Sequence, residues 1–253
     1  MTNPDPLFVS TRTESENYRF DSVALSGLAP DGGLYLPKPS RAISRKINLD
    51  RLVELEFMER NIRILEDLLP SDEFPPNRIE KIVFDAYKHF PESGSPIGWF
   101  LTKYYLSYFF NLVTLDDDLA IAELFHGPSG SFKDFALQLF PYILRGCQTG
   151  DVVPPTLILA ATSGDTGGAL LSGLDNANLD GMYGIVLMPA EGTSEIQKRQ
   201  MLSFNSNPNI SVLQIDSDFD YCQKIVKRML TENTNYFAAE LFMLLRSVHA
   251  FKM

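Results

Sequence analysis

The chain has 253 residues, of which 45% are hydrophobic and 21% charged, and its formal net charge is −10 at pH 7. This length and apolar content support one large domain or two smaller ones with a true core. The acidic balance argues against general nucleic-acid binding and against binding to an anionic membrane, because both attract basic patches. The longest apolar runs, such as LFMLL, are too short to span a bilayer.

The chain has two cysteines, Cys147 and Cys222, without the spacing of a metal site. Its first residues, MTNPDPLFVS, carry Asp5 and two prolines, which suits neither a signal peptide nor an Arg-rich transit peptide. These features predict a reduced protein of the cytoplasm or of an organellar matrix, and we take the cytoplasm as the expected location.

The first part of the chain shows helical periodicity. Apolar residues recur at helical spacing over residues 48–70, where Pro70 closes the pattern, and again over residues 76–90. The segment ESGSP, residues 92–96, has the composition of a linker. We therefore expect a helical N-terminal domain over residues 1–95 and a second domain over residues 96–253.

The second part changes character. Three short, almost continuous apolar runs, TLILAA (156–161), YGIVLMP (183–189) and ISVLQID (210–216), are each followed by a polar or glycine-containing turn and a helical pattern. Strands of this kind are buried on both faces, and their alternation with helices indicates a parallel sheet. The pattern predicts an α/β fold.

A glycine-rich turn follows the first of these strands in AATSGDTGGAL, residues 160–170. Backbone N–H groups and the helix dipole at such a turn form a site for a carboxylate or phosphate, and Ser163 and Thr166 can add hydroxyl donors. Structural turns use the same residues, so the turn alone leaves both interpretations open. It matches neither GxGxxG nor a P-loop.

Lys133 lies in HGPSGSFKDFALQ, residues 126–138, directly behind a loop rich in Gly, Ser and Pro. A single lysine on an amphipathic helix is usually a solvated surface charge. Its neighbours Phe132, Phe135 and Ala136 are apolar, however, and they place the amine close to the core. Burial of a lysine disfavours its ammonium form, and the neutral amine is the form that attacks carbonyl compounds.

Five ordered motifs resemble threonine synthase of the bacterial and fungal type, which has an extended N-terminal domain. They are STRTESENYRF with LSGLAPDGGLYLP, ELFHGPSGSFKDFALQ, ATSGDTGGA, SEIQKRQM and DFDYCQKIVK. The likeness runs from about residue 9 to about residue 230. Because the motifs occur in order and at reasonable spacing, together they are far more specific than any one of them.

The resemblance implies the fold-type II architecture of enzymes that depend on pyridoxal 5′-phosphate (PLP). It implies a carbon–oxygen lyase acting on phosphates, which converts O-phospho-L-homoserine and water to L-threonine and phosphate. Lys133 matches the family lysine that holds PLP covalently and that, once freed by substrate, moves protons at Cα, Cβ and Cγ. The partners implied are the small-molecule substrate and neither nucleic acid nor membrane.

The resemblance also assigns the other site residues. Ser163, Gly164 and Thr166 match a loop that binds the substrate carboxylate, and Asp165 stands near the cofactor hydroxyl where many relatives have Asn. Ser194 and Gln197 form an S-x-x-Q capping box. That helix start is expected either to face the substrate phosphate or to serve as a plain structural cap.

The sequence departs from the family pattern after residue 230. It contains neither the Asn-Ser-Ile-Asn segment nor the Gly-Asn-Phe-Gly loop that grips the PLP phosphate. We therefore expect a catalytic domain that is truncated at its C-terminal side and, for this chain alone, weak PLP binding, inactivity, poor solubility and homo-oligomers. Pro141 is expected to bend the helix after Lys133.

Two alternative functions remain open at this point. One is a non-catalytic fragment or interaction protein, and the other is a phosphohomoserine lyase that releases 2-oxobutyrate with the same lysine. Absorbance after addition of PLP separates the enzymes from a non-catalytic protein, and analysis of the product separates the two enzymes.

Overall fold

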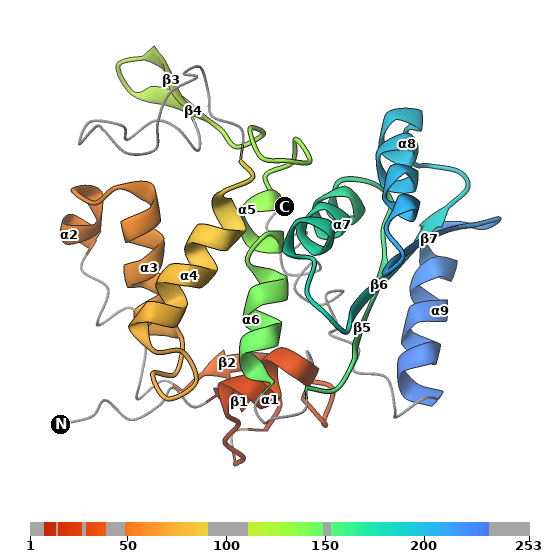
Figure 1. Ribbon diagram of the computed structural model, residues 1–253, viewed down its shortest axis with the longest axis horizontal. Coiled ribbons are helices and arrows are strands. Elements are labelled where there is room, and N and C mark those ends of the chain that lie inside the picture. Colours follow the sequence, from red (N-terminus) through yellow and green to blue (C-terminus); the bar gives the residue numbers. More distant parts are fainter. Residues whose placement is uncertain are drawn as a thin grey trace.

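The computed structural model describes residues 8–13, 15–26, 29–38, 49–90, 111–148 and 153–232. Figure 1 shows the N-terminal helices at one side of the molecule and a sheet with its helices at the other. The expected linker at residues 92–96 and the tail after residue 232 lie outside the described residues.

The N-terminal part is helical, as predicted, with one small antiparallel strand pair. The strands are β1 (Phe8–Ser10) and β2 (Tyr35–Pro37). The helices are α1 (Phe20–Ser26), α2 (Leu49–Val53), α3 (Phe57–Leu68) and α4 (Pro76–Tyr87). Buried side chains of α3 and α4 form one core with Phe74 and with Leu139 and Cys147 from the segment after Lys133. The α3 and α4 members are Leu65, Ile79, Ile82, Val83, Ala86 and Tyr87.

The periodic segment 48–70 forms two helices instead of one. Between α2 and α3, the Arg60 guanidinium donates to the carbonyl oxygens of Leu52 and Leu55, each at 2.8 Å. Carbonyls at a helix end have no intrahelical donor, so the arginine satisfies groups that a continuous helix would have paired. The apolar spacing continues through this turn, which is why the sequence pattern conceals it.

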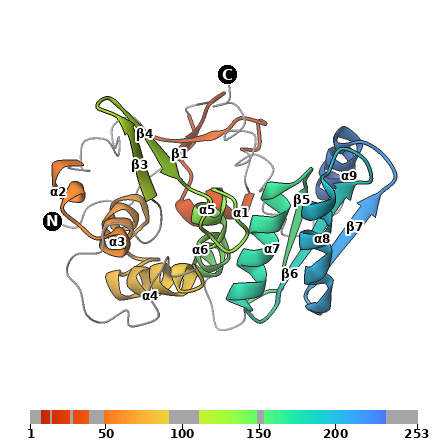
Figure 2. The same ribbon diagram turned by 90° about the horizontal axis from the view of Figure 1, so that it is seen from above.

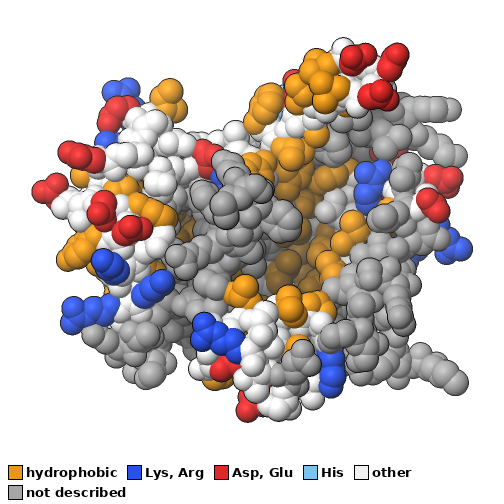
Figure 3. Space-filling model, turned by 180° about the vertical axis from the view of Figure 1, so that it is seen from behind, with side chains coloured by type: hydrophobic (Ala, Val, Ile, Leu, Met, Phe, Trp, Pro, Cys, Tyr) orange, Lys and Arg blue, Asp and Glu red, His pale blue; other side chains and the backbone are white. Residues whose placement is uncertain are grey.

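A hairpin leads from the helical part toward Lys133. It pairs β3 (Asn111–Asp116) with β4 (Leu119–Glu123) in antiparallel register. Val113, Leu115, Leu119 and Ile121 are exposed on it. Figure 3 shows hydrophobic side chains beside acidic ones at the upper right, the corner where this hairpin lies.

Two short helices, α5 (Asp134–Leu137) and α6 (Phe140–Cys147), follow Lys133. The predicted bend at Pro141 inside one helix is therefore wrong, because the first helix ends at Leu137. Pro141 occupies the first turn of α6, where its missing N–H has no intrahelical partner to lose. Figure 2 shows α5 and α6 between the N-terminal helices and the sheet.

The sheet has three parallel strands in the order β5-β6-β7. They are β5 (Thr156–Ala161), β6 (Met182–Pro189) and β7 (Ile210–Ile215). The strands alternate with α7 (Asp165–Ala177), α8 (Glu195–Ser203), the short 3-10 helix η3 (Phe204–Ser206) and α9 (Phe219–Glu232). All three predicted strands are confirmed to within one residue at each end.

Helices cover both faces of β5 and β6, as their continuous apolar runs predicted, but β7 is buried on one face only and exposes Leu213 on the other. On one face, Ile158, Val186 and Val212 pack with Leu170 of α7 and Met201 of α8. On the other face, the buried side chains are Leu159, Ala161, Leu187, Cys222 and Val226. Helix α9 therefore covers the face opposite to α7 and α8, which leaves the carboxyl ends of the strands as the open edge.

The described residues lack two kinds of feature, a helix that could span a membrane and a cluster of metal ligands. No helix within these ranges combines the length and hydropathy needed to cross a bilayer. The same ranges hold no cluster of three His, Cys, Asp or Glu side chains placed to bind a metal ion. Cys147 and Cys222 are both buried free thiols, and burial raises the pKa of Cys147 to about 12.

Candidate active site

The glycine-rich turn at the carboxyl end of β5 is organised by a residue that sequence reasoning missed. The Thr162 hydroxyl accepts hydrogen bonds from the N–H groups of Gly164, at 3.1 Å, and Gly167, at 3.0 Å. Thr162 is buried, whereas Ser163 is exposed and Thr166 is partly buried in the first turn of α7. The Gly164 N–H therefore serves the turn, and the hydroxyls of Ser163 and Thr166 lie where a ligand can reach them.

Lys133 lies immediately before α5 and reaches the start of α7. Its Nζ is 3.5 Å from Oδ2 of Asp165 and 4.4 Å from the centroid of the Phe132 ring. The lysine side chain is 10% exposed. A partly buried amine between an aromatic ring and a carboxylate fits the prediction that Lys133 is no ordinary surface charge.

Asp165 joins Lys133 to α8. While its Oδ2 faces Lys133, its Oδ1 accepts from Nε2 of Gln197 at 2.5 Å. The carboxylate thus lies between two donors that come from separate elements. Because Asp165 is itself the first residue of α7, its charge also lies at the positive end of that helix.

The predicted capping box at the start of α8 is confirmed in part. The Ser194 hydroxyl accepts from the Gln197 N–H at 3.3 Å and donates to Gln197 Oε1 at 2.9 Å. In a full capping box the Gln side chain would bond back to the N-cap backbone. Here its amide nitrogen donates to Asp165 instead. The cap is therefore part of one cluster, the Lys133 cluster, which consists of Lys133, Asp165, Ser194 and Gln197.

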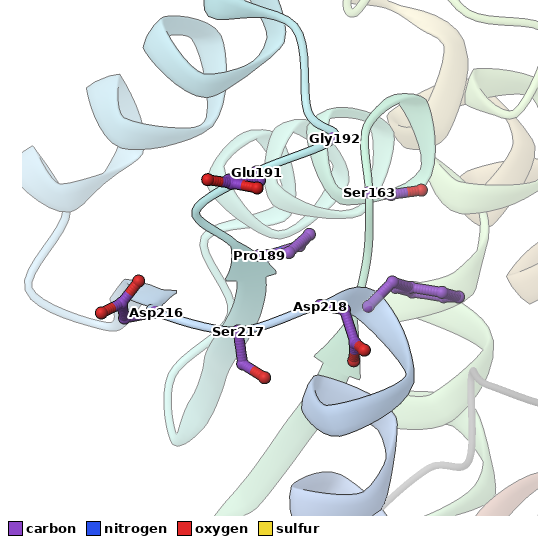
Figure 4. A pocket seen from close by; sticks show the side chains of 8 residues that line it. Ser163, Pro189, Glu191, Gly192, Asp216, Ser217 and Asp218 are labelled. Carbon is purple, nitrogen blue, oxygen red and sulfur yellow. The ribbon is translucent and has the colours of Figure 1, made fainter.

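A pocket of about 660 Å³ opens at the carboxyl ends of the three strands (Figure 4). Its walls come from the loops after β5, β6 and β7. They are Ser163, Pro189, Glu191, Gly192, Asp216, Ser217, Asp218 and Phe219. Ser163 belongs both to this pocket and to the glycine-rich turn, which puts the pocket next to the Lys133 cluster.

The structure thus brings four predicted site residues, Lys133, Asp165, Ser194 and Gln197, into one hydrogen-bonded series. Ser163, Gly164 and Thr166 lie on the turn at its edge. Gln200, which the sequence did not single out, donates from α8 to the carbonyl of Ser129 at 2.9 Å, in the loop before Lys133.

Residues 7–87 match the family described as "Threonine synthase N terminus". The chain aligns with threonine synthase of Eremothecium gossypii at 31% identity over 236 residues, or 89% of its length. Its fold is similar to the PLP-bound threonine synthase from Brucella melitensis, at 31% identity and a TM-score of 0.68 over 90% of this chain. The chain resembles threonine synthases over about 90% of its length.

The same likeness holds for other threonine synthases and their relatives. The yeast threonine synthase structure superposes on 94% of this chain with a TM-score of 0.73 at 26% identity. Human "Threonine synthase-like 1" is 31% identical over 239 residues. The predicted resemblance and the fold-type II architecture are confirmed.

The chain spans only part of these relatives. It covers 43% of the Eremothecium threonine synthase and 30% of human "Threonine synthase-like 1". It covers 45% of the Brucella structure and 46% of the yeast structure. The matched part includes the N-terminal helices, Lys133 and the three-stranded sheet.

Proposed function

We propose that this chain provides the lysine-bearing part of a PLP site and serves threonine biosynthesis. The proposed reaction converts O-phospho-L-homoserine and water to L-threonine and phosphate. The observation that supports it best is the Lys133 amine, partly buried and 3.5 Å from Asp165 at the start of the glycine-rich turn. The similarity of the chain to threonine synthases supports the same reaction.

The residues around Lys133 fit the aldehyde and one polar ring substituent of PLP. An aldehyde needs one reachable amine. Lys133 supplies the amine, and Asp165 is placed to contact a polar substituent beside it. When bound, PLP supplies an electron sink that stabilises negative charge on an amino-acid substrate.

The other residues would bind and orient the substrate. The exposed Ser163 hydroxyl and the Thr166 hydroxyl lie at the N-terminal end of α7, where the helix dipole favours a carboxylate. Ser194 and Gln197 would meet the substrate phosphate from α8. The freed Lys133 amine would take and return protons at Cα, Cβ and Cγ of the substrate.

The proposal is tested by locating the lysine that reacts with PLP. The chain is mixed with PLP, reduced with borohydride and digested, and the modified peptide is identified by mass spectrometry. The expected result is preferential modification of Lys133 together with absorbance near the visible edge. Modification spread evenly over the lysines would contradict the proposal, and phosphate release from O-phospho-L-homoserine then tests turnover.

Removing the turn hydroxyls is expected to weaken substrate binding. Ser163→Ala and Thr166→Ala should each weaken binding of O-phospho-L-homoserine by about 1–3 kcal/mol, because each loses a charge-assisted hydrogen bond. Isothermal titration calorimetry measures the change. Ser206→Ala is the control, since the Ser206 hydroxyl, in η3, donates to the carbonyl of Ser203 at the end of α8. Unchanged affinity in both turn variants would assign the loop a purely structural role.

A non-catalytic interaction protein is the second candidate. The lining of the pocket favours it, because the carboxylates of Glu191, Asp216 and Asp218 would repel a phosphate. Lys133 would then be modified by PLP without phosphate release, so the same two measurements separate the candidates.

A further inference from the structure

The residue directly after Lys133 carries a fully buried carboxylate. Asp134 has 0% exposure, although its neighbours Phe132 and Ala136 are exposed. Aspartate is seldom fully buried unless its oxygens are satisfied. The partners of Asp134 therefore define what this carboxylate does.

Those partners hold the loop that leads into Lys133. Oδ2 of Asp134 accepts from the Ser129 N–H at 2.9 Å, and Oδ1 accepts from the Ser129 hydroxyl at 2.7 Å. Gly127 lies so close that a Cβ there would be 2.4 Å from Oδ2. The carboxylate thus closes residues 129–134 into a ring and packs against Gly127, and Lys133 is the residue just before Asp134.

The ring is attached to two other elements. Gln138 of α5 donates to Asp134 Oδ1 at 3.5 Å and to Ser172 of α7 at 3.4 Å. From the far side, Gln200 of α8 donates to the carbonyl of Ser129 at 2.9 Å. The loop is therefore fixed relative to α7, which carries Asp165, and to α8, which carries the Gln197 partner of Asp165.

The hydrogen-bond donors around Asp134 are matched to a carboxylate. The two donors of Ser129 and the amide of Gln138 all point hydrogens at the carboxylate, and none of these three contacts needs a proton on Asp134. Burial raises the pKa of the Asp134 carboxyl, and the hydrogen bonds from Ser129 oppose that shift. A neutral amide in its place would bring an N–H₂ group against these donors.

We propose that Asp134 is a positioning residue for the Lys133 amine, acting through Ser129 and the 127–134 loop rather than by direct contact. The inference rests on the proposed function, because it gives the reason why the lysine must be held in place. It assigns to Asp134 the task of keeping Nζ beside Asp165 and shielded from solvent.

The test compares local reactivity of Lys133 with global stability. Lysines are reductively methylated with formaldehyde and cyanoborohydride, and the rate at Lys133 is divided by the rate at Lys81, whose side chain is 75% exposed. Asp134→Asn is expected to raise this ratio by about tenfold, because the loop opens locally once the buried hydrogen bonds are lost. Val226→Ala, in the core under α9, is the control for a general loss of stability.

Ser129→Ala provides a second variant should Asp134→Asn fail to fold. It keeps the carboxylate and its bond to the Ser129 N–H, so a smaller rise in the ratio is expected. The methylation ratio of the double variant should exceed that of Asp134→Asn only slightly, because both changes act on the same contact. A ratio that stays at the wild-type value in the folded variants, with or without a lower melting temperature, would overturn the proposal.

Modification with PLP distinguishes a failure of this inference from a failure of the proposed function. With PLP and borohydride, folded Asp134→Asn is expected to lose the preference for Lys133 over other lysines. Absence of that preference in the wild-type chain would contradict the proposed function, whereas the methylation ratio would still decide whether Asp134 positions the amine.

Discussion

Lys133→Ala is expected to remove PLP modification at residue 133 and to lower any phosphate release by about a thousandfold or more, because under the proposed function it deletes both the attachment point and the proton carrier. The fold should change little. The recorded contacts of the lysine amine are those to Asp165 at 3.5 Å and to the exposed Phe132 ring. Absorbance with PLP, phosphate release and thermal melting by circular dichroism measure these effects.

Two further variants sharpen the test of Lys133. Lys133→Arg keeps a cation near Asp165 but cannot attach PLP, so it should be as inactive as the alanine variant. Lys198→Ala removes another poorly exposed lysine, which pairs with Glu195 on α8, and should leave modification of Lys133 intact. Retained modification or turnover in Lys133→Ala would place the reactive amine elsewhere.

Gly173→Ala is expected to destabilise the fold by about 1–3 kcal/mol through overpacking. A Cβ at this position would lie 2.2 Å from the carbonyl oxygen of Leu137, so α7 and α5 would have to separate. In a helix without this contact, alanine would instead stabilise by about 1 kcal/mol relative to glycine. A loss of stability in urea unfolding therefore measures the contact between the two helices directly.

Gly168→Ala is the matched control in the same helix. Its Cβ would meet the amide end of the Gln200 side chain at 3.1 Å, and a flexible side chain can move away. We expect its free energy of unfolding to stay near or above the wild-type value. Equal destabilisation by both substitutions would mean that the approach of α7 to α5 is not specially close.

The parallel sheet was predictable because its strands need no long-range information. Residues 156–161 and 183–189 are nearly continuous apolar runs that are buried on both faces, whereas the similar run 210–216 is a strand buried on one face only. The helices α3 and α4 were predictable for the same reason, since one apolar stripe determines each of them. The location of Lys133 near the start of a helix followed from the loop composition before it.

The contacts of the site were not predictable from local pattern. Asp165 lies 32 residues from Lys133 in the chain, and its second contact comes from yet another helix. Thr162 and Asp134 were missed because a threonine before a turn and an aspartate beside a lysine are usually solvent-exposed. The break before Pro141 was missed because one short apolar segment fits one helix or two equally well.

The three strands of the sheet lie side by side in the order in which they occur in the chain. As the polypeptide leaves the ribosome, each new strand can therefore pair with the one made just before it. Lys133 emerges before all three strands. Asp165, which contacts its amine, and Gln197, which contacts Asp165, both emerge later. During translation the amine of this lysine therefore lacks its contact with Asp165 until α7 has docked, and Asp165 lacks Gln197 until α8 has docked.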